Sequence, residues 1–379
     1  MGAWASTAFF LRVLREHPGL VGAYLRAKLR ACSVGREWSR KDGFSARPLA
    51  VTLKPVLTCN LRCRMCSYVA NGAVETAVNE SLPLDVWERF VDDVAAWRPY
   101  LWLTGGEPTL YPYLVPLIRR IKGRGLICGM TTNGTTLEHL AEELVAAGLD
   151  VLVVSLDGRE NVHNRVRGHP KAFQRAEAGI RRLHQARAQR KRRKPLLIGN
   201  CSLSPDNYRD AEEMVTLAHE LGLDALGFQH LWMITPEMVD LHNSRWGTEH
   251  AVAAERWATS ERIAMDPAEV ADVVHRTRRL ASPLAVRWYP DLEPSEVFTY
   301  YEQPPTFVRR QPAYCAWLNT DILPNGDVSP CFDLVCGNIT QEPLTAIWNN
   351  ESFRRHRQRL ATDGDFPICA RCCSYWRRG

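Results

Sequence analysis

The feature that most constrains this chain is a group of three cysteines in one short loop: Cys59, Cys63 and Cys66. The loop follows an apolar run from Leu49 to Leu57, which predicts a buried strand. Three thiolates on one tight loop can bind three irons of a cubane iron–sulfur cluster, because soft sulfur ligands suit such clusters. No fourth cysteine lies nearby in the sequence, so the fourth iron would be open to a small molecule.

A structural zinc site and a disulfide are the alternatives for these cysteines. Zinc needs a closed tetrahedral set of ligands, whereas Cys59–Cys66 offers three cysteines. Disulfides need an oxidising compartment, and the N-terminus lacks the apolar segment and small-residue cleavage site of a signal peptide. We therefore expect a cytoplasmic protein.

The order of apolar segments predicts the fold class. From about residue 49 short apolar runs alternate with amphipathic helices, which favours a parallel βα architecture. Strands are expected near 50–57, 100–104, 126–131, 150–156, 196–201 and 225–231. Helices are expected near 83–97, 112–123, 136–147, 171–190, 207–221 and 267–281. Six units are too few for a closed eight-stranded barrel, and 232–262 predicts an insertion after the sixth strand.

Further motifs stand at the ends of the predicted strands. The second strand ends in Gly105, Gly106, Glu107 and Pro108, the third in Thr132-Asn133, and the fourth in Ser155-Leu156-Asp157. With the C-x3-C-x2-C loop in front, this series resembles the radical S-adenosylmethionine (SAM) superfamily. Met65 is a small departure, because an aromatic residue usually precedes the last cysteine.

The resemblance implies a partial (β/α)6 barrel, like an incomplete TIM barrel, with all motifs at the carboxyl ends of its strands. It also implies that Cys59, Cys63 and Cys66 bind a 4Fe–4S cluster whose open iron is chelated by SAM. The other implied cofactor-binding residues are Gly105, Gly106, Glu107 and Pro108 at the methionyl ammonium, Ser155 at the carboxylate or ribose, and Thr132, Asn133 and Asp157 beside them.

Three residues are candidates for contact with a substrate. His163 and Arg167 match a His/Arg-Gly element common after the fourth strand in the family, where loop ordering or substrate contact is expected. His230 leaves the sixth predicted strand within the segment Phe228–Met233, where we expect the substrate to lie. It is a candidate proton donor, and a purely structural histidine is the alternative.

A second group of cysteines lies near the C-terminus: Cys315, Cys331, Cys336, Cys369, Cys372 and Cys373. The group resembles a SPASM or shortened "twitch" extension, a small cysteine-rich α+β unit. We predict one auxiliary 4Fe–4S cluster held by Cys315, Cys331, Cys369 and Cys372, with Cys336 or Cys373 as possible replacements. A zinc ribbon is the alternative, because four cysteines can also close a tetrahedral site.

The predicted organisation is a helical segment over 1–48, a core barrel over 49–290 and the auxiliary domain over 291–379. Apolar and basic residues alternate in the first segment, which predicts two short helices split at Pro18-Gly19. Such helices dock across the open side or bottom of a barrel, or lie on the inner face of a membrane.

Charge is uneven along the chain. The net charge is +6, and the run from Arg181 to Lys194 alone carries eight Lys or Arg residues. The run is a solvated helix end, or a contact for an acidic lipid surface or a polyanionic partner. Nucleic-acid binding is not favoured, because no aromatic residues interleave these charges.

The resemblance implies an oxidoreductase-type enzyme that cleaves SAM reductively to a 5′-deoxyadenosyl radical and abstracts a hydrogen atom, with the auxiliary cluster transferring electrons. We expect a small-molecule, natural-product or lipid-linked substrate and a reductant such as flavodoxin or ferredoxin. A peptide-modifying enzyme is the alternative, although 1–48 looks too short for a winged-helix peptide-binding domain. A non-enzymatic electron carrier or redox sensor would not need the Gly-Gly-Glu-Pro strand end.

Overall fold

The strands form a single sheet in a computed structural model that describes residues 7–76, 81–258, 264–280, 284–308 and 312–372. The sheet order is β7-β6-β5-β4-β3-β2-β1-β8-β9, and neighbours from β7 to β8 run parallel. The predicted strands are β1 (Ala50–Val56), β2 (Tyr100–Gly105), β3 (Ile127–Thr132), β4 (Val151–Ser155), β5 (Leu196–Ser202) and β6 (Ala225–Gln229).

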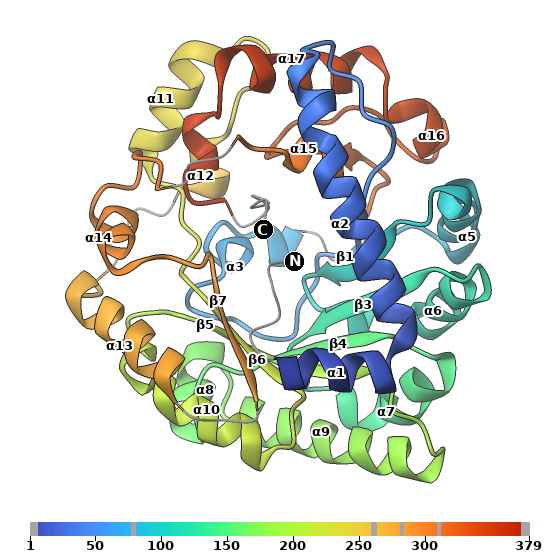
Figure 1. The fold of residues 1–379 in the computed structure, drawn as a ribbon, viewed down its shortest axis with the longest axis vertical. Helices are drawn as coiled ribbons and strands as arrows, with labels where there is room; N and C mark the ends of the chain where they lie inside the picture. The colour runs from blue at the N-terminus through green and yellow to red at the C-terminus, as the bar shows by residue number, and fades with distance from the viewer. Residues whose placement is uncertain (1–6, 77–80, 259–263, 281–283, 309–311, 373–379) are drawn as a thin grey trace.

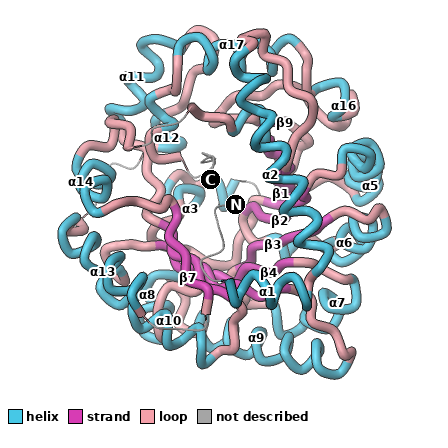
Figure 2. The backbone as a smooth tube through the Cα atoms, in the orientation of Figure 1, coloured by secondary structure: helices cyan, strands magenta, loops and turns pink. Residues whose placement is uncertain are grey.

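Three further strands extend the sheet. β7 (Ala285–Tyr289) adds a seventh parallel strand, and β8 (Asn319–Ile322) extends the sheet on the far side of β1. β9 (Val328–Ser329) pairs antiparallel with β8. The result is an α/β partial barrel whose sheet continues into the C-terminal extension, as Figures 1 and 2 show.

Helices cover the outer face of the sheet. Those at predicted positions are α5 (Leu84–Val94), α6 (Leu114–Gly123), α7 (Leu137–Ala147), α9 (Ala172–Gln189), α10 (Ala211–Glu220) and α13 (Pro267–Arg279). The others are α1 (Thr7–Glu16), α2 (Pro18–Ser39), α3 (Ser67–Ala70), α4 (Ala73–Thr76), α8 (Glu160–Arg167), α11 (Pro236–Trp246), α12 (Ala254–Trp257), α14 (Pro294–Glu302), α15 (Cys315–Leu318), α16 (Leu344–Ile347) and α17 (Glu351–Asp363). Short 3-10 helices are η1 (Ala95–Trp97), η2 (Pro108–Leu110), η3 (Tyr208–Asp210) and η4 (Pro367–Cys369).

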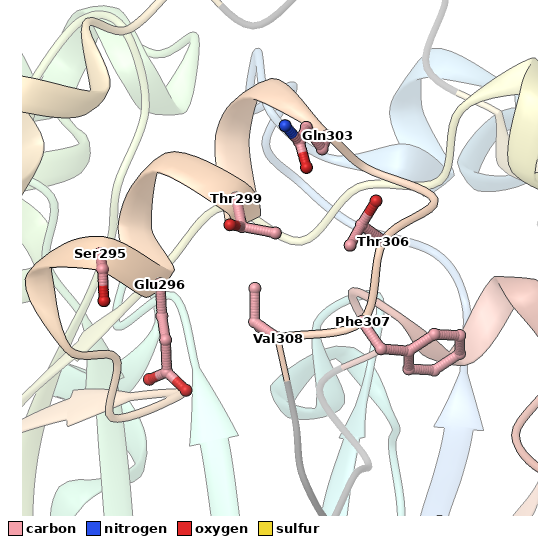
Figure 3. A pocket seen from close by; sticks show the side chains of 7 residues that line it. All are labelled: Ser295, Glu296, Thr299, Gln303, Thr306, Phe307 and Val308. Carbon is pink, nitrogen blue, oxygen red and sulfur yellow. The ribbon is translucent and has the colours of Figure 1, made fainter.

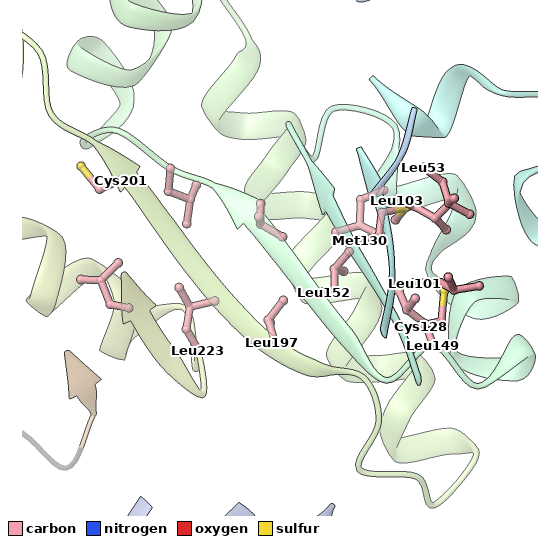
Figure 4. Packing of buried hydrophobic residues seen from close by; sticks show 14 of the residues in the cluster. Leu53, Leu101, Leu103, Cys128, Met130, Leu149, Leu152, Leu197, Cys201 and Leu223 are labelled. Carbon is pink, nitrogen blue, oxygen red and sulfur yellow. The ribbon is translucent and has the colours of Figure 1, made fainter. Parts of the chain in front are cut away.

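The core lies between the sheet and these helices. Successive strand side chains point to opposite faces, so alternate residues such as Leu53, Leu101 and Met130 are fully buried in it (Figure 4). The residues between them face the concave side, which we call the lumen. There the Trp102 indole donates to the Thr131 hydroxyl (Nε1–Oγ1 3.0 Å).

The N-terminal helices lie across the amino ends of the strands. Phe9 and Val13 of α1 pack against the first residues of three strands: Leu196, Ala225 and Ala285. Ala27 and Val34 of α2 belong to a cluster with Leu49 and Leu318, which precede β1 and β8. Figure 1 shows both helices on this face, with α2 running towards α17. These contacts favour docking at the bottom of the barrel.

Two details of this region differ from the prediction. The break between the helices falls at His17, and α2 has 22 residues, so it is not short. Cys32 is exposed on α2, whereas Cys128 and Cys201 are buried. Across the described ranges we find no helix with the length and apolarity needed to cross a membrane.

Candidate active site

Two glycines bring the end of β2 against the cysteine loop. The Gly106 and Glu107 amides donate to the carbonyls of Val56 (3.0 Å) and Thr58 (2.8 Å). A Cβ atom on Gly106 would lie 2.2 Å from the carbonyl oxygens of Leu57 and Thr58. Gly105 has a φ of +129° and is equally crowded by the Val56 oxygen, at 2.2 Å. Only glycine fits at both positions, since it has no Cβ and tolerates positive φ.

The carboxylate of Glu107 joins the ends of β2 and β3. One oxygen accepts from the Thr132 hydroxyl (2.7 Å) and from the amide (3.1 Å) and hydroxyl (2.7 Å) of Thr109. The other accepts from the Asn133 amide (2.7 Å). Burial raises the pKa of Glu107, and these hydrogen bonds oppose that shift. Because four donors occupy the carboxylate, we infer that Glu107 and Thr132 position the ends of β2 and β3. We infer that the backbone of the Gly105–Pro108 motif makes the contact with SAM.

Polar donors face two of the three loop sulfurs. The Asn133 amide nitrogen lies 3.9 Å from Cys59 Sγ, and an Arg167 guanidinium nitrogen lies 3.7 Å from Cys63 Sγ. Burial raises the pKa of Cys59 to about 11, and the neighbouring thiols of Cys63 and Cys66 add to the shift. Donors aimed at sulfur stabilise thiolates and tune the metal group that they bind.

Arg167 reaches this position through a buried ion pair. Its guanidinium contacts the Asp157 carboxylate (Nε–Oδ2 2.6 Å), and Asp157 also accepts from the Ser202 amide (3.0 Å). His163 is buried behind this pair, where its Nδ1 accepts from the Asp157 amide (3.1 Å). Burial lowers the pKa of His163 to about 3, so the ring is neutral. The predicted alternative of loop ordering therefore describes His163 and Arg167 better than substrate contact.

His230 also lies outside the lumen. Its Nδ1 is 2.8 Å from the Tyr301 hydroxyl, and its ring packs beside Trp288 and Tyr300. Burial lowers its pKa to about 3, and only 1% of the residue is exposed. A substrate could not reach this imidazole without displacing the aromatic core, so the structural alternative is the one that the geometry supports.

A charged pair that sequence reasoning missed occupies the lumen. Lys54 of β1 contacts Asp321 of β8 (Nζ–Oδ2 2.7 Å) and the Tyr68 hydroxyl of α3 (3.2 Å). Burial alone would lower the pKa of Lys54, but Asp321 and Tyr68 raise it above the ordinary value. The Asp321 side chain is 35% exposed. Ser155, the last residue of β4, also lies on the lumen side, in register with Asn200 of β5.

The C-terminal extension brings the four predicted cysteines together. The pKa values of Cys331 and Cys369 are raised well above the ordinary value, first by burial and then by the neighbouring thiols, among them Cys315 and Cys372. Cys336 also contributes to the raised pKa of Cys331, but it packs in the barrel core, where the Ser352 hydroxyl contacts its sulfur (3.4 Å). Cys373 lies outside the described residues.

Arg371, between two of these cysteines, fixes their loop to α14. It is buried, and its guanidinium donates to five backbone carbonyls at 2.7–3.0 Å: those of Thr299, Tyr300, Gln303, Thr306 and Ala370. A pocket of about 350 Å³ adjoins the same helix (Figure 3). It is lined by Ser295, Glu296, Thr299, Gln303, Thr306, Phe307 and Val308. None of the predicted site residues lines it, so it is not the reaction chamber.

Family models match both parts of this arrangement. The model described as the radical SAM superfamily matches residues 53–218, and an iron–sulfur cluster-binding domain of the SPASM type matches 314–373. The first match includes the cysteine loop and the ends of β2 to β5, and the second includes all four auxiliary cysteines. The chain is a radical SAM enzyme with a SPASM-type extension.

Relatives of this radical SAM enzyme act on different substrates. It is 28% identical to an AdoMet-dependent heme synthase of Methanosarcina barkeri, over 82% of its own length and 85% of the relative. It is also 28% identical to a PqqA peptide cyclase of Ruegeria pomeroyi, over 86% and 79%. The structure of Streptococcus suis SuiB bound to precursor peptide SuiA has a TM-score of 0.61 over 84% and 68% of the two chains. Its 17% identity restricts that likeness to the fold.

The donors of the radical SAM enzyme suit the 4Fe–4S clusters that its two family models imply. The first site supplies three thiols from one loop and the second supplies four from separate segments, and cysteine thiolates are the usual ligands of such clusters. In the part of the chain that the structure describes, no three Cys, His, Asp or Glu side chains come close enough to share one metal ion. The match to an iron–sulfur cluster-binding domain favours a cluster over zinc at the C-terminal group.

Proposed function

We propose that this enzyme oxidises a compact organic substrate bound in the lumen between its two cysteine groups. Cys59, Cys63 and Cys66 would hold the first cluster, and the C-terminal cysteines the auxiliary one. When bound, SAM and the clusters supply a carbon radical that removes a hydrogen atom and an acceptor for the remaining electron. The observation that carries the proposal is a row of aromatic side chains between the two groups.

This aromatic rim consists of Tyr68, Trp232, Trp257 and Phe332. The Trp257 ring lies 6.0 Å from Tyr68, 6.2 Å from Trp232 and 5.0 Å from Phe332, between ring centroids. Its indole nitrogen donates to the Asp333 carboxylate (2.8 Å), which fixes its orientation. All four rings are half-buried, so they can stack on a flat or apolar substrate while excluding water.

The aromatic rim includes residues that adjoin each of the two cysteine groups in the sequence. Tyr68 comes two residues after Cys66, and Phe332 follows Cys331 directly. The rim therefore borders both groups at once. A substrate held against it would present its C–H bond near the first cluster and remain close to the second.

Lys54 and Asp321 supply the polar chemistry of the lumen. A substrate that loses a hydrogen atom and then an electron forms a double bond by releasing either a proton or, from a carboxylate side chain, carbon dioxide; only the first route needs a proton acceptor. The Asp321 carboxylate is the exposed acceptor beside the rim, and Lys54 holds it in place. A carboxylate substrate could instead pair with the Lys54 ammonium, which is also hydrogen-bonded to Tyr68 of the rim.

The first substrate class to test is a flat compound with carboxylate side chains. The aromatic rim and Lys54 match such a compound, and the heme synthase relative acts, by its name, in tetrapyrrole chemistry. A peptide is the second candidate, because the relation to the PqqA peptide cyclase covers as much of the chain.

The test uses the reconstituted, reduced enzyme with SAM and iron-coproporphyrin III. We expect 5′-deoxyadenosine formation to rise with the porphyrin and the porphyrin to lose a carboxyl group, as seen by mass spectrometry. The Trp257→Ala variant should lose this stimulation and keep the slow cleavage of SAM. No stimulation by the porphyrin, together with mass changes in a mixed peptide library, would refute the first class and support the second.

A further inference from the structure

The two N-terminal helices leave a row of leucines uncovered. Leu11 and Leu14 on α1 are 55% and 44% exposed, and Leu25 and Leu29 on α2 are 56% and 73% exposed. Residues three or four apart share one face of a helix, so each pair forms part of an outward stripe. The opposite face of α1, with Phe9, packs on the barrel. The leucine row is therefore not needed to hold the helices in place.

Basic side chains surround the leucine row. Arg15, whose side chain is 77% exposed, lies beside Leu14, and Arg26 is exposed beside Leu25. The exposed run 190–193 contains four consecutive Lys or Arg residues. This run lies next to α1, because Arg193 pairs with Glu16 (Nη1–Oε1 3.6 Å).

Acidic groups offset only part of this charge. Between residues 7 and 39 the acidic residues are Glu16 and Glu37. Glu16 pairs with Arg15 and Arg193. Glu37 is buried and pairs with Arg30 (Oε2–Nη2 2.8 Å). The outer face of the two helices is therefore apolar along its centre and positive at its margins.

We propose that this face, formed by the leucine row and the run 190–193, docks on an anionic lipid bilayer. The leucines would enter the boundary between headgroups and acyl chains, and the basic residues would contact lipid phosphates. A second copy of the chain is disfavoured as the occupant, since a two-fold contact would place like positive margins against each other. A nucleic acid would leave the leucines without an apolar partner.

The proposal orients the enzyme. The docking face covers the amino ends of the strands, whereas the cysteine loop and the glycine motif lie at the carboxyl ends. The lumen mouth then opens away from the bilayer. The membrane would position the enzyme, and the substrate would enter from the aqueous side.

Sedimentation with vesicles tests the proposal on the full chain. We expect it to sediment with phosphatidylcholine vesicles that contain phosphatidylserine, less with phosphatidylcholine alone, and to be released by high salt. The variant Leu25→Gln/Leu29→Gln should bind at least about tenfold more weakly. The matched control Leu241→Gln/Leu280→Gln changes two exposed leucines elsewhere and should bind as the wild type does.

Two results with the wild type and the leucine variant, and a third with a charge variant, would overturn the proposal. One is absence of binding to phosphatidylserine vesicles at low salt by a protein with native circular dichroism. The other is a change of Leu25→Gln/Leu29→Gln from dimer to monomer without vesicles, which would make the face a contact between copies. A second variant, Arg190→Gln/Arg193→Gln, removes charge from exposed positions alone, and unchanged binding by it would equally contradict the charged margin.

Discussion

Replacing Arg371 with methionine should displace the auxiliary cysteines from their positions, while the first cysteine loop stays intact. Arg371 is 1% exposed and donates to five backbone carbonyls, four of them in or just after α14. Methionine preserves much of the volume and leaves those carbonyls without their donor. A buried acceptor that loses its partner costs about 1–3 kcal/mol. With partial relaxation we expect a loss of about 3–5 kcal/mol in the free energy of unfolding.

The assay counts iron and measures SAM cleavage in the same preparation. Because Arg371 lies between Cys369 and Cys372, iron should fall from about eight to about four per chain. Slow formation of 5′-deoxyadenosine should persist, since it depends on Cys59, Cys63 and Cys66. The control Arg359→Met removes a surface ion pair with Glu249, and exposed ion pairs contribute little to stability. About eight irons and unchanged stability in Arg371→Met would refute this reasoning.

Three further predictions follow from the same geometry. Gly106→Ala should lose the iron of the first loop, because its Cβ would meet backbone oxygens at 2.2 Å, whereas Gly123→Ala meets nothing within 4 Å; retained iron in both contradicts this. Burial lowers the pKa of His163 and His230 to about 3, so below about pH 6.5 the unfolded chain binds protons that the folded chain does not. Stability should then fall by up to about 1.4 kcal/mol per pH unit for each histidine, and His230→Gln should reduce the slope in pH-dependent denaturation by one proton. With a substrate that releases a proton and not carbon dioxide, Asp321→Asn should lower product formation relative to 5′-deoxyadenosine at least about tenfold; an unchanged ratio would remove Asp321 from the chemistry.

The sequence predicts the barrel well because its signals are local. Each of the first six strands is an apolar run followed by an amphipathic helix, and the helices fall within a few residues of their predicted positions. β7 was missed because it has five residues and turns Arg287 towards the lumen side, which breaks the apolar pattern. The parallel pairing of β8 (Asn319–Ile322) with β1 leaves no local signal, because it joins segments that are distant in the chain.

Site residues that belong to a sequence motif could be predicted. Site residues whose position depends on tertiary contacts could not. The cysteines and the glycine motif could be read directly. The burial of His163 and His230 could not, because it depends on neighbours distant in the chain, such as Tyr301. Lys54 did leave a signal, a charged residue inside a run taken as apolar. Arg371 left none, since nothing in its local sequence shows that it reaches α14.

The most direct test of the account is SAM cleavage by the reconstituted, reduced chain, with Cys63→Ser and Cys331→Ala measured beside the wild type. We predict 5′-deoxyadenosine from the wild type, none from Cys63→Ser, and continued formation from Cys331→Ala, because the first loop alone is assigned to cleavage. Equal formation by Cys63→Ser, or loss of formation in Cys331→Ala with the first cluster still present, would contradict the assignment of the two cysteine groups.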